Sequence, residues 1–122
     1  MSTILHVEDN EFNRKIVRQA LRQTTYRLIE ATDGEAAVAM ALETLPDLIL
    51  MDVQLPKLSG LEATRRLRAD PRTAHIPLIV VTSFALGGDE QRAMEAGASA
   101  YIAKPYSPRE LVALIRKLAP ES

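Results

Sequence analysis

The sequence of 122 residues contains no cysteine, and only 4% of its residues are aromatic. Without cysteine the chain has no disulfides, no thiolate metal sites and no thiol nucleophile. No apolar run is long enough to cross a bilayer, and no apolar N-terminal segment follows a basic start. The formal net charge of −1 gives no overall field toward nucleic acid or anionic lipid. We therefore expect a soluble, cytoplasmic protein that binds neither nucleic acid nor membrane directly.

The composition is that of an ordinary globular domain, with 47% hydrophobic and 25% charged residues. A chain of this length can bury one substantial core but hardly two. No linker, low-complexity tract or change of composition interrupts it. The sequence thus predicts a single domain over residues 1–122. A methionine start directly before the first apolar run favours a stand-alone chain.

Short runs rich in Ile, Leu and Val alternate with stretches of helical spacing. The runs predict β-strands near residues 3–8, 27–31, 47–52, 77–82 and 99–103, each followed by a helix. Five such units joined by short connections predict an α/β fold, a doubly wound parallel sheet with helices on both faces. A closed barrel of this type would need eight units.

Helix boundaries have local signals. Residues able to cap a helix N-terminus through the side chain are Asn10, Asp33, Ser59 and Ser107. The last two are followed three residues later by Glu62 and Glu110, which completes two capping boxes. The stretch from Ala36 to Leu45 predicts a helix packed closely on the sheet, and Gly97 predicts the end of another.

Helix faces can be predicted from the same spacing. One apolar face comprises Phe12, Ile16, Val17, Ala20 and Leu21, and a second comprises Leu111, Val112, Ile115 and Leu118. We expect the side chains of Phe12 and Ile16 to lie in the core. The arginines Arg65, Arg66 and Arg68 are expected to form a solvated helix face.

Four of the five predicted strands run into polar residues suited to phosphoryl chemistry. These residues are Glu8, Asp9, Asp52, Thr82 and Lys104. The carboxyl ends of parallel strands meet at one edge of a sheet, which is where such sheets bind ligands. Each residue taken singly is also typical of a turn or a solvated surface. Their combination at one edge instead favours a functional site.

The chemistry of these residues is consistent. Carboxylates from Glu8, Asp9 and Asp52 can hold Mg²⁺, which prefers oxygen ligands. The ammonium of Lys104 and the hydroxyl of Thr82 can each hold a phosphoryl oxygen. A carboxylate that attacks phosphorus becomes an acyl phosphate, a covalent strategy available to Asp52.

The same residues lie in motifs that resemble the response-regulator receiver domains of the CheY-like superfamily, most closely single-domain receivers of the DivK type. The matching motifs are Val7-Glu8-Asp9-Asn10, Asp47 to Pro56, Ser59-Gly60, Pro77 to Ser83, Gly97-Ala98 and Tyr101 to Pro105. They extend over essentially the whole chain. The resemblance implies a five-stranded parallel sheet in the order 2-1-3-4-5, a flavodoxin-like fold.

The resemblance also implies roles for the strand-end residues. Asp52 is then the phosphorylated residue, and Mg²⁺ is held by Asp52 together with Glu8, Asp9 and the backbone carbonyl of Gln54. Thr82 and Lys104 bind the phosphoryl oxygens. The Lys104–Pro105 peptide bond is usually cis in this family.

Three further residues have implied regulatory roles. Tyr101 matches the switch aromatic, which turns inward when Thr82 moves toward the phosphoryl group; the alternative is that it only covers an edge strand. Gln54 and Phe84 flank the path of the hydrolytic water in this family. We hypothesise that bulky Phe84 limits that water and lengthens the phosphorylated lifetime, although it could equally be a packing residue of the loop.

The implied function is a phosphorylation-dependent signalling switch. Its phosphodonor is a histidine kinase or a phosphotransfer protein, and its output is a changed affinity for a protein target through the fourth helix, fifth strand and fifth helix. Such a switch is not a turnover enzyme, although it partly catalyses its own phosphorylation and dephosphorylation. Two alternatives stay open: a receiver that belongs to a hybrid histidine kinase, and a phosphatase of the haloacid-dehalogenase type. The latter needs a second Asp where this chain has Gln54.

Overall fold

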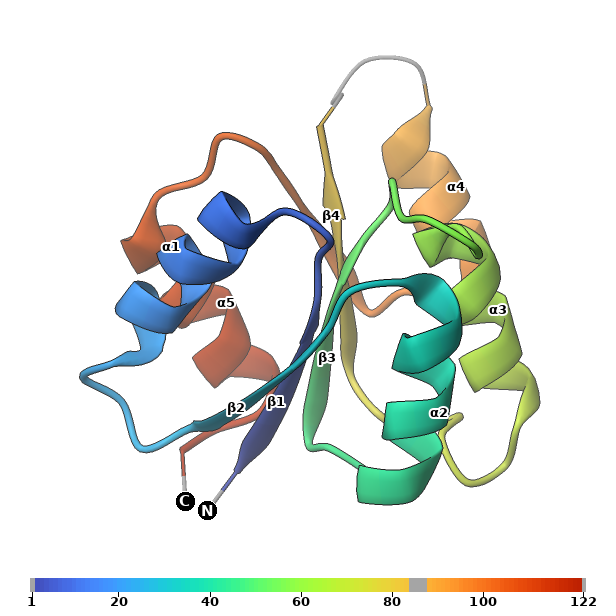
Figure 1. Ribbon diagram of the computed structural model, residues 1–122, viewed down its shortest axis with the longest axis horizontal. Helices are drawn as coiled ribbons and strands as arrows, with labels where there is room; N and C mark the ends of the chain where they lie inside the picture. The colour runs from blue at the N-terminus through green and yellow to red at the C-terminus, as the bar shows by residue number, and fades with distance from the viewer. Residues whose placement is uncertain (1, 84–87, 122) are drawn as a thin grey trace.

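The computed structural model describes residues 2–83 and 88–121, which form one parallel sheet with helices on both faces (Figure 1). The strands are β1 (Thr3–Val7), β2 (Arg27–Ala31), β3 (Leu48–Asp52), β4 (Leu78–Thr82) and β5 (Ala100–Ala103). The helices are α1 (Glu11–Leu21), α2 (Gly34–Thr44), α3 (Gly60–Ala69), α4 (Asp89–Ala96) and α5 (Pro108–Leu118). The strand order is β2-β1-β3-β4-β5, so the predicted fold class and topology are confirmed.

The sheet separates two apolar cores because successive strand residues point to opposite faces. Helices α1 and α5 cover one face, and α2, α3 and α4 cover the other (Figure 1). Ile4 and Leu50 belong to the core under α1 and α5, whereas Leu5 and Met51 belong to the core under α2, α3 and α4. We call these two sides the α1/α5 face and the α2–α4 face.

The same alternation assigns the strand-end residues to faces. Asp52 follows Leu50 by two positions and therefore lies on the α1/α5 face. Thr82 follows Val80 by two positions and lies on the α2–α4 face. Tyr101 is paired in register with Val80 and shares that face. The predicted site residues thus meet at one sheet edge but approach it from two sides.

All four predicted N-caps are confirmed. The Asn10 and Asp33 side chains accept hydrogen bonds from backbone N–H groups three residues later, at 3.0 and 2.8 Å. Ser59 and Ser107 do the same at 3.2 and 3.1 Å. Gly97 ends α4 with a φ of 108°, a left-handed conformation that glycine adopts without strain.

A few element boundaries differ from the prediction. Helix α2 begins at Gly34 because the Asp33 cap sets its start, and it ends at Thr44, with Leu45 as a left-handed cap. Strand β1 ends one residue early, and β3, β4 and β5 each start one residue late. The strand-flanking residues still donate or accept single hydrogen bonds, but they lie outside the paired ladders. None of the helices in the described part of the chain combines the length and the apolar character needed to span a bilayer.

Two predictions about helix faces are wrong. Phe12 is 70% exposed because it lies in the first turn of α1, before the helix passes over the sheet. Arg68 does not lie on a solvated face. Its guanidinium is half-buried at the end of α3 and donates to the backbone carbonyls of Gly97 and Ile76, each at 2.7 Å. The chain folds back around the end of α3 there, and this supplies acceptors that helical periodicity does not predict.

Candidate functional site

The centre of the candidate site is an ammonium held between two carboxylates. Lys104 follows β5, and its Nζ donates to Glu8 Oε1 and to Asp52 Oδ2, each at 3.0 Å. Glu8 follows β1 and Asp52 ends β3, which are neighbouring strands, and Lys104 reaches them from β5, beyond β4 in the sheet. The two carboxyl residues are only 2% and 4% exposed. The structure therefore brings these three predicted residues together, with both carboxyl groups buried and the lysine side chain partly exposed.

The remaining carboxylate oxygens are oriented by the backbone. Asp52 Oδ1 accepts a hydrogen bond from the Gln54 N–H at 3.1 Å. Glu8 Oε2 accepts one from the Asn10 N–H at 3.3 Å. In both cases the donor lies two residues after the acid, where the chain turns away from the end of the strand. The turns at the strand ends thus fix the direction of both side chains.

The electrostatics of the cluster reflect burial and crowding of like charges. Burial, reinforced by the neighbouring Asp52 carboxylate, raises the pKa of Glu8 to about 7. Burial alone would lower the pKa of Lys104, but its hydrogen bonds to Asp52 and Glu8 outweigh burial and raise the pKa. The ammonium is therefore charged at neutral pH, and it holds together two acids that would otherwise repel each other.

The cluster has the chemistry of a divalent-cation site. Two buried carboxylates already converge on one cationic atom, and Mg²⁺ commonly uses one or two protein carboxylates together with water and phosphoryl oxygens. Asp9 follows directly but is exposed. Within residues 2–83 and 88–121, no three His, Cys, Asp or Glu side chains converge closely enough to hold a metal by themselves. The residues present fit a metal that completes its shell with other oxygens.

Thr82 and Tyr101 lie on the α2–α4 face, and Thr82 borders the cluster. Thr82 is buried, and its carbonyl accepts a hydrogen bond from the Lys104 N–H at 2.8 Å. Tyr101 is 38% exposed on β5, an edge strand, and a hydrogen bond to Glu90 raises the pKa of its phenol. The tyrosine thus points outward and reaches α4. Phe84, for which we predicted an effect on lifetime, lies outside the described residues.

An apolar hollow of about 250 Å³ opens next to the ammonium. It is lined by Phe12, Asn13, Ile16, Lys104, Pro105 and Tyr106. The Lys104–Pro105 peptide bond in its wall is cis. The exposed ring of Phe12 therefore stands at the rim of a depression that leads to the carboxylate cluster.

Two residues near the cluster, Arg14 and His6, are not among the predicted site residues. Arg14 Nη1 donates to the Glu8 carbonyl oxygen at 2.9 Å. His6 is buried on the α1/α5 face, its Nδ1 has no hydrogen-bond partner in the described part of the chain, and burial lowers its pKa to about 4. A polar residue inside the apolar run of β1 was the available signal for His6. No pattern indicated that Arg14 reaches back across a turn.

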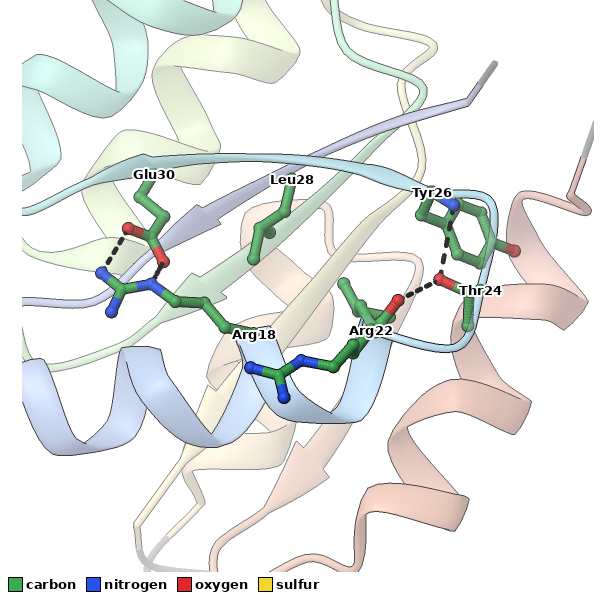
Figure 2. Close-up of a pocket in the computed structure, with 7 residues that line it drawn as sticks. Arg18, Arg22, Thr24, Tyr26, Leu28 and Glu30 are labelled. Atoms are coloured by element: carbon green, nitrogen blue, oxygen red, sulfur yellow. Dashed lines mark hydrogen bonds and ion pairs between the residues drawn. The ribbon is translucent and has the colours of Figure 1, made fainter.

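A second hollow lies away from the strand ends, between the end of α1 and β2, with a volume of about 350 Å³ (Figure 2). Leu21 and Leu28 contribute apolar surface to it, and the ion pair of Arg18 with Glu30 closes one end. It contains none of the predicted site residues.

Comparisons with known proteins agree with this geometry. Residues 4–116 match the family described as the response regulator receiver domain. The chain is 45% identical over 114 residues to the polar-differentiation response regulator DivK of Brucella anthropi, and the match covers 93% of each chain.

Solved structures show the same fold. The receiver domain of a sensor histidine kinase from Pseudomonas aeruginosa is 38% identical and superimposes with a TM-score of 0.91 over 97% of each chain. That structure has a magnesium ion coordinated in its active-site cleft. The chemotaxis protein CheY4 of Vibrio cholerae is 26% identical, with a TM-score of 0.89 over 97% of this chain and 98% of that one.

Proposed function

This chain belongs to the response regulator receiver domain family, and on that premise we propose that it accepts a phosphoryl group on Asp52. A receiver is a signalling domain of a two-component system rather than a classical enzyme. The observation that carries the proposal is the Lys104 ammonium, which bridges the buried carboxylates of Glu8 and Asp52 at 3.0 Å each. We propose one receiver domain over residues 1–122.

The proposed reaction uses a phosphohistidine of a histidine kinase or phosphotransfer protein. A carboxylate oxygen of Asp52 attacks phosphorus, the new O–P bond forms, and the P–N bond breaks. The electron pair of that bond leaves with the imidazole, which takes up a proton from solvent. The hydrogen bond from the Gln54 N–H keeps one Asp52 oxygen engaged and thereby orients the other.

The charges of the transferred group must be held as it arrives. Mg²⁺, bound by Glu8, Asp9, Asp52 and the backbone carbonyl of Gln54, would supply positive charge against the phosphoryl oxygens. Lys104 exchanges a carboxylate partner for a phosphoryl oxygen, and the Thr82 hydroxyl donates to another. With a small-molecule phosphodonor the same groups support self-phosphorylation, and with water they support autodephosphorylation. Gln54 and Phe84 would tune that last step.

The proposed output is a change in protein affinity. When Thr82 turns toward the phosphoryl group, Tyr101 moves from its outward position into the space released, and the face made by α4, β5 and α5 changes shape. The location of both residues on the α2–α4 face supports this coupling. The phosphodonor approaches from the other side, where Phe12 borders the hollow beside Lys104.

The experiment that tests this function is phosphoryl labelling of the purified chain. We expect labelling from a phosphorylated histidine kinase or phosphotransfer protein that needs Mg²⁺, is abolished by EDTA and is lost in Asp52→Asn. Asp70→Asn is the matched control, since Asp70 pairs with Arg72 at the far end of α3. Labelling that survives in Asp52→Asn would overturn the assignment, and steady phosphate release from a monoester would favour a phosphatase instead.

A second candidate is a receiver that forms part of a longer histidine kinase. The similarity to the receiver domain of the Pseudomonas aeruginosa sensor histidine kinase favours it. The complete genomic reading frame distinguishes the two, because only this candidate requires kinase sequence in the same frame.

A further inference from the structure

Arg14 is a mostly buried cation beside the carboxylate cluster, and it has no assigned role in the proposed phosphoryl transfer. It lies on α1 with a side chain that is 13% exposed. Its Nη1 donates to the carbonyl oxygen of Glu8 at 2.9 Å, and its Nη2 donates to Glu11 Oε2 at 2.7 Å. Through these two bonds the guanidinium connects the peptide unit between Glu8 and Asp9, two predicted metal ligands, to Glu11 in the first turn of α1.

The bond to the Glu8 carbonyl fixes a peptide plane. A peptide unit is rigid, so holding its oxygen fixes the orientation in which the next residue leaves it. The next residue is Asp9. On its other side, Glu8 is held by its N–H, which donates to the Ala31 carbonyl of β2 at 3.0 Å. The backbone of the Glu8–Asp9 turn is thus held by two hydrogen bonds, one from the Glu8 N–H to Ala31 and one from Arg14 to the Glu8 carbonyl.

Arg14 is itself aligned by a series of ion pairs. Glu11 receives Arg14 on one carboxylate oxygen and Arg18 on the other, at 2.7 and 2.6 Å. Arg18 also makes a two-pronged pair with Glu30 on β2, both bonds 2.7 Å long (Figure 2). A fork-shaped guanidinium held by one carboxylate presents its other prong in a fixed direction.

We propose that Arg14 is a positioning residue of the acidic cluster, which holds the Glu8–Asp9 turn in the arrangement that accepts a divalent cation. This inference rests on the proposed function, because it concerns the metal that phosphoryl transfer to Asp52 requires. It assigns to Arg14 no contact with the metal or with the phosphoryl group.

A positioning role and a purely electrostatic role of Arg14 predict opposite changes in Mg²⁺ affinity when the residue is removed. As a positive charge next to an acidic site, Arg14 repels a divalent cation, so its removal by itself would tighten Mg²⁺ binding. As the group that holds the turn, it pre-organises the ligands, so its removal weakens Mg²⁺ binding. The direction of the change therefore separates the two roles.

The test is Mg²⁺ binding to the whole folded chain without any phosphodonor, measured by calorimetry and by the backbone amide NMR signals of Glu8 and Asp9. We expect Arg14→Met to weaken Mg²⁺ binding about tenfold, the lower end of the losses seen when partners of metal ligands are removed. The amide signal of Asp9 should broaden or split in this variant. Arg14→Lys, which keeps the charge and a donor, should recover part of the affinity.

Lys15→Met is the matched control. It removes the same charge from the same helix at an exposed position outside the series of ion pairs, and it leaves the Glu8 carbonyl bond in place. We expect its Mg²⁺ affinity to stay within about twofold of the wild type. Equal weakening in both variants, or binding by Arg14→Met as tight as or tighter than the wild type, would overturn the positioning role while leaving labelling of Asp52 intact.

Two other outcomes are decisive. A wild-type chain that binds no Mg²⁺ would overturn the metal requirement of the proposed function, and the role of Arg14 with it. If Arg14→Met loses its folded circular dichroism spectrum, Arg14→Lys takes its place, and unchanged Mg²⁺ affinity in Arg14→Lys then contradicts the proposal.

Discussion

Two partly buried cations stand at opposite ends of the sheet, and their partners differ. Lys104 lies at the carboxyl ends of the strands and bonds to the carboxylates of Glu8 and Asp52. Arg68 lies near the start of β4 and bonds to neutral backbone carbonyls, those of Ala74, Ile76 and Gly97, at 3.1, 2.7 and 2.7 Å. Burial lowers the pKa of Arg68, whereas hydrogen bonds to acids raise that of Lys104.

The difference in partners implies different roles for the two cations, one in the reaction and one in the stability of the fold. A cation held by two acids can exchange one of them for an incoming anion, because its neighbours gain a metal ion or a proton in return. A guanidinium that donates to three carbonyls from two separate segments has nothing to exchange, and its loss leaves several acceptors without a donor. We therefore expect Lys104 to matter for reaction and Arg68 for folding.

The largest effect is expected for Lys104→Met, which removes the cation held by two acids. We expect Asp52 labelling to fall about 100-fold, the scale of losing one fixed charge that faces a transferred group. The free energy of unfolding should change by less than about 1 kcal/mol, since Glu8, with its pKa near 7, can take up a proton when the ammonium is gone. Initial labelling rates and urea unfolding measure the two effects.

Lys57→Met is the control for this variant, because Lys57 is exposed and lies 3.8 Å from Asp33. Labelling of Lys104→Met at the wild-type rate would show that the ammonium is structural, and the contrast with Arg68 would disappear.

The reverse pattern is expected for Arg68→Met. Its loss leaves backbone carbonyls in a half-buried position without their donor, so we expect the protein to lose about 3 kcal/mol of stability in urea unfolding. Asp52 labelling under native conditions should match the wild type. Arg66→Met, an exposed neighbour on α3, should change stability by less than about 0.5 kcal/mol. A similarly small loss in Arg68→Met would contradict the assignment.

His6 differs from both cations, because in the described part of the chain its Nδ1 is bonded neither to a carboxylate nor to a backbone carbonyl. Burial lowers its pKa from 6.5 to about 4, and Glu30 and Asp52 oppose that shift while Lys104 and Arg14 add to it. The unfolded chain therefore binds a proton below pH 6.5 that the folded chain does not bind until about pH 4. The stabilisation that comes from keeping His6 neutral is fully present above pH 6.5, and it is lost as the pH falls toward 4.

In metal-free buffer this single group should lower the free energy of unfolding by about 2 kcal/mol between about pH 7 and about pH 5. His6→Leu should remove that component from the urea-unfolding profile. His75→Gln, which changes an exposed histidine, should retain it. A His6→Leu profile that falls as steeply as the wild type would place the acid sensitivity elsewhere.

The smallest expected effect concerns the lifetime of the phosphorylated state. If the side chain of Phe84 limits the approach of water, Phe84→Ala should shorten the half-life of phospho-Asp52 a few-fold, as measured by the loss of label over time. An unchanged half-life would leave Phe84 as a packing residue of its loop.

Much of this molecule could be predicted from local pattern. Apolar runs and capping residues indicated every strand and helix, and the position of Glu8, Asp52 and Lys104 at strand ends indicated one shared edge. The errors have a common cause. Phe12 was assigned from helical periodicity and Arg68 from the charges around it, and neither pattern tells whether another segment of the chain covers the residue.

The parallel sheet and the gathering of polar residues at its carboxyl edge follow from the amino-acid sequence, because side-chain alternation, capping and strand ends are local properties of the chain. Which of those residues touch depends on the packing of the folded chain. It placed Lys104 between Glu8 and Asp52, put Thr82 and Tyr101 on the other face, and brought Arg14 back to the Glu8 carbonyl. Such contacts join segments that are distant in sequence or cross a turn, and they depend on how the helices pack on the sheet.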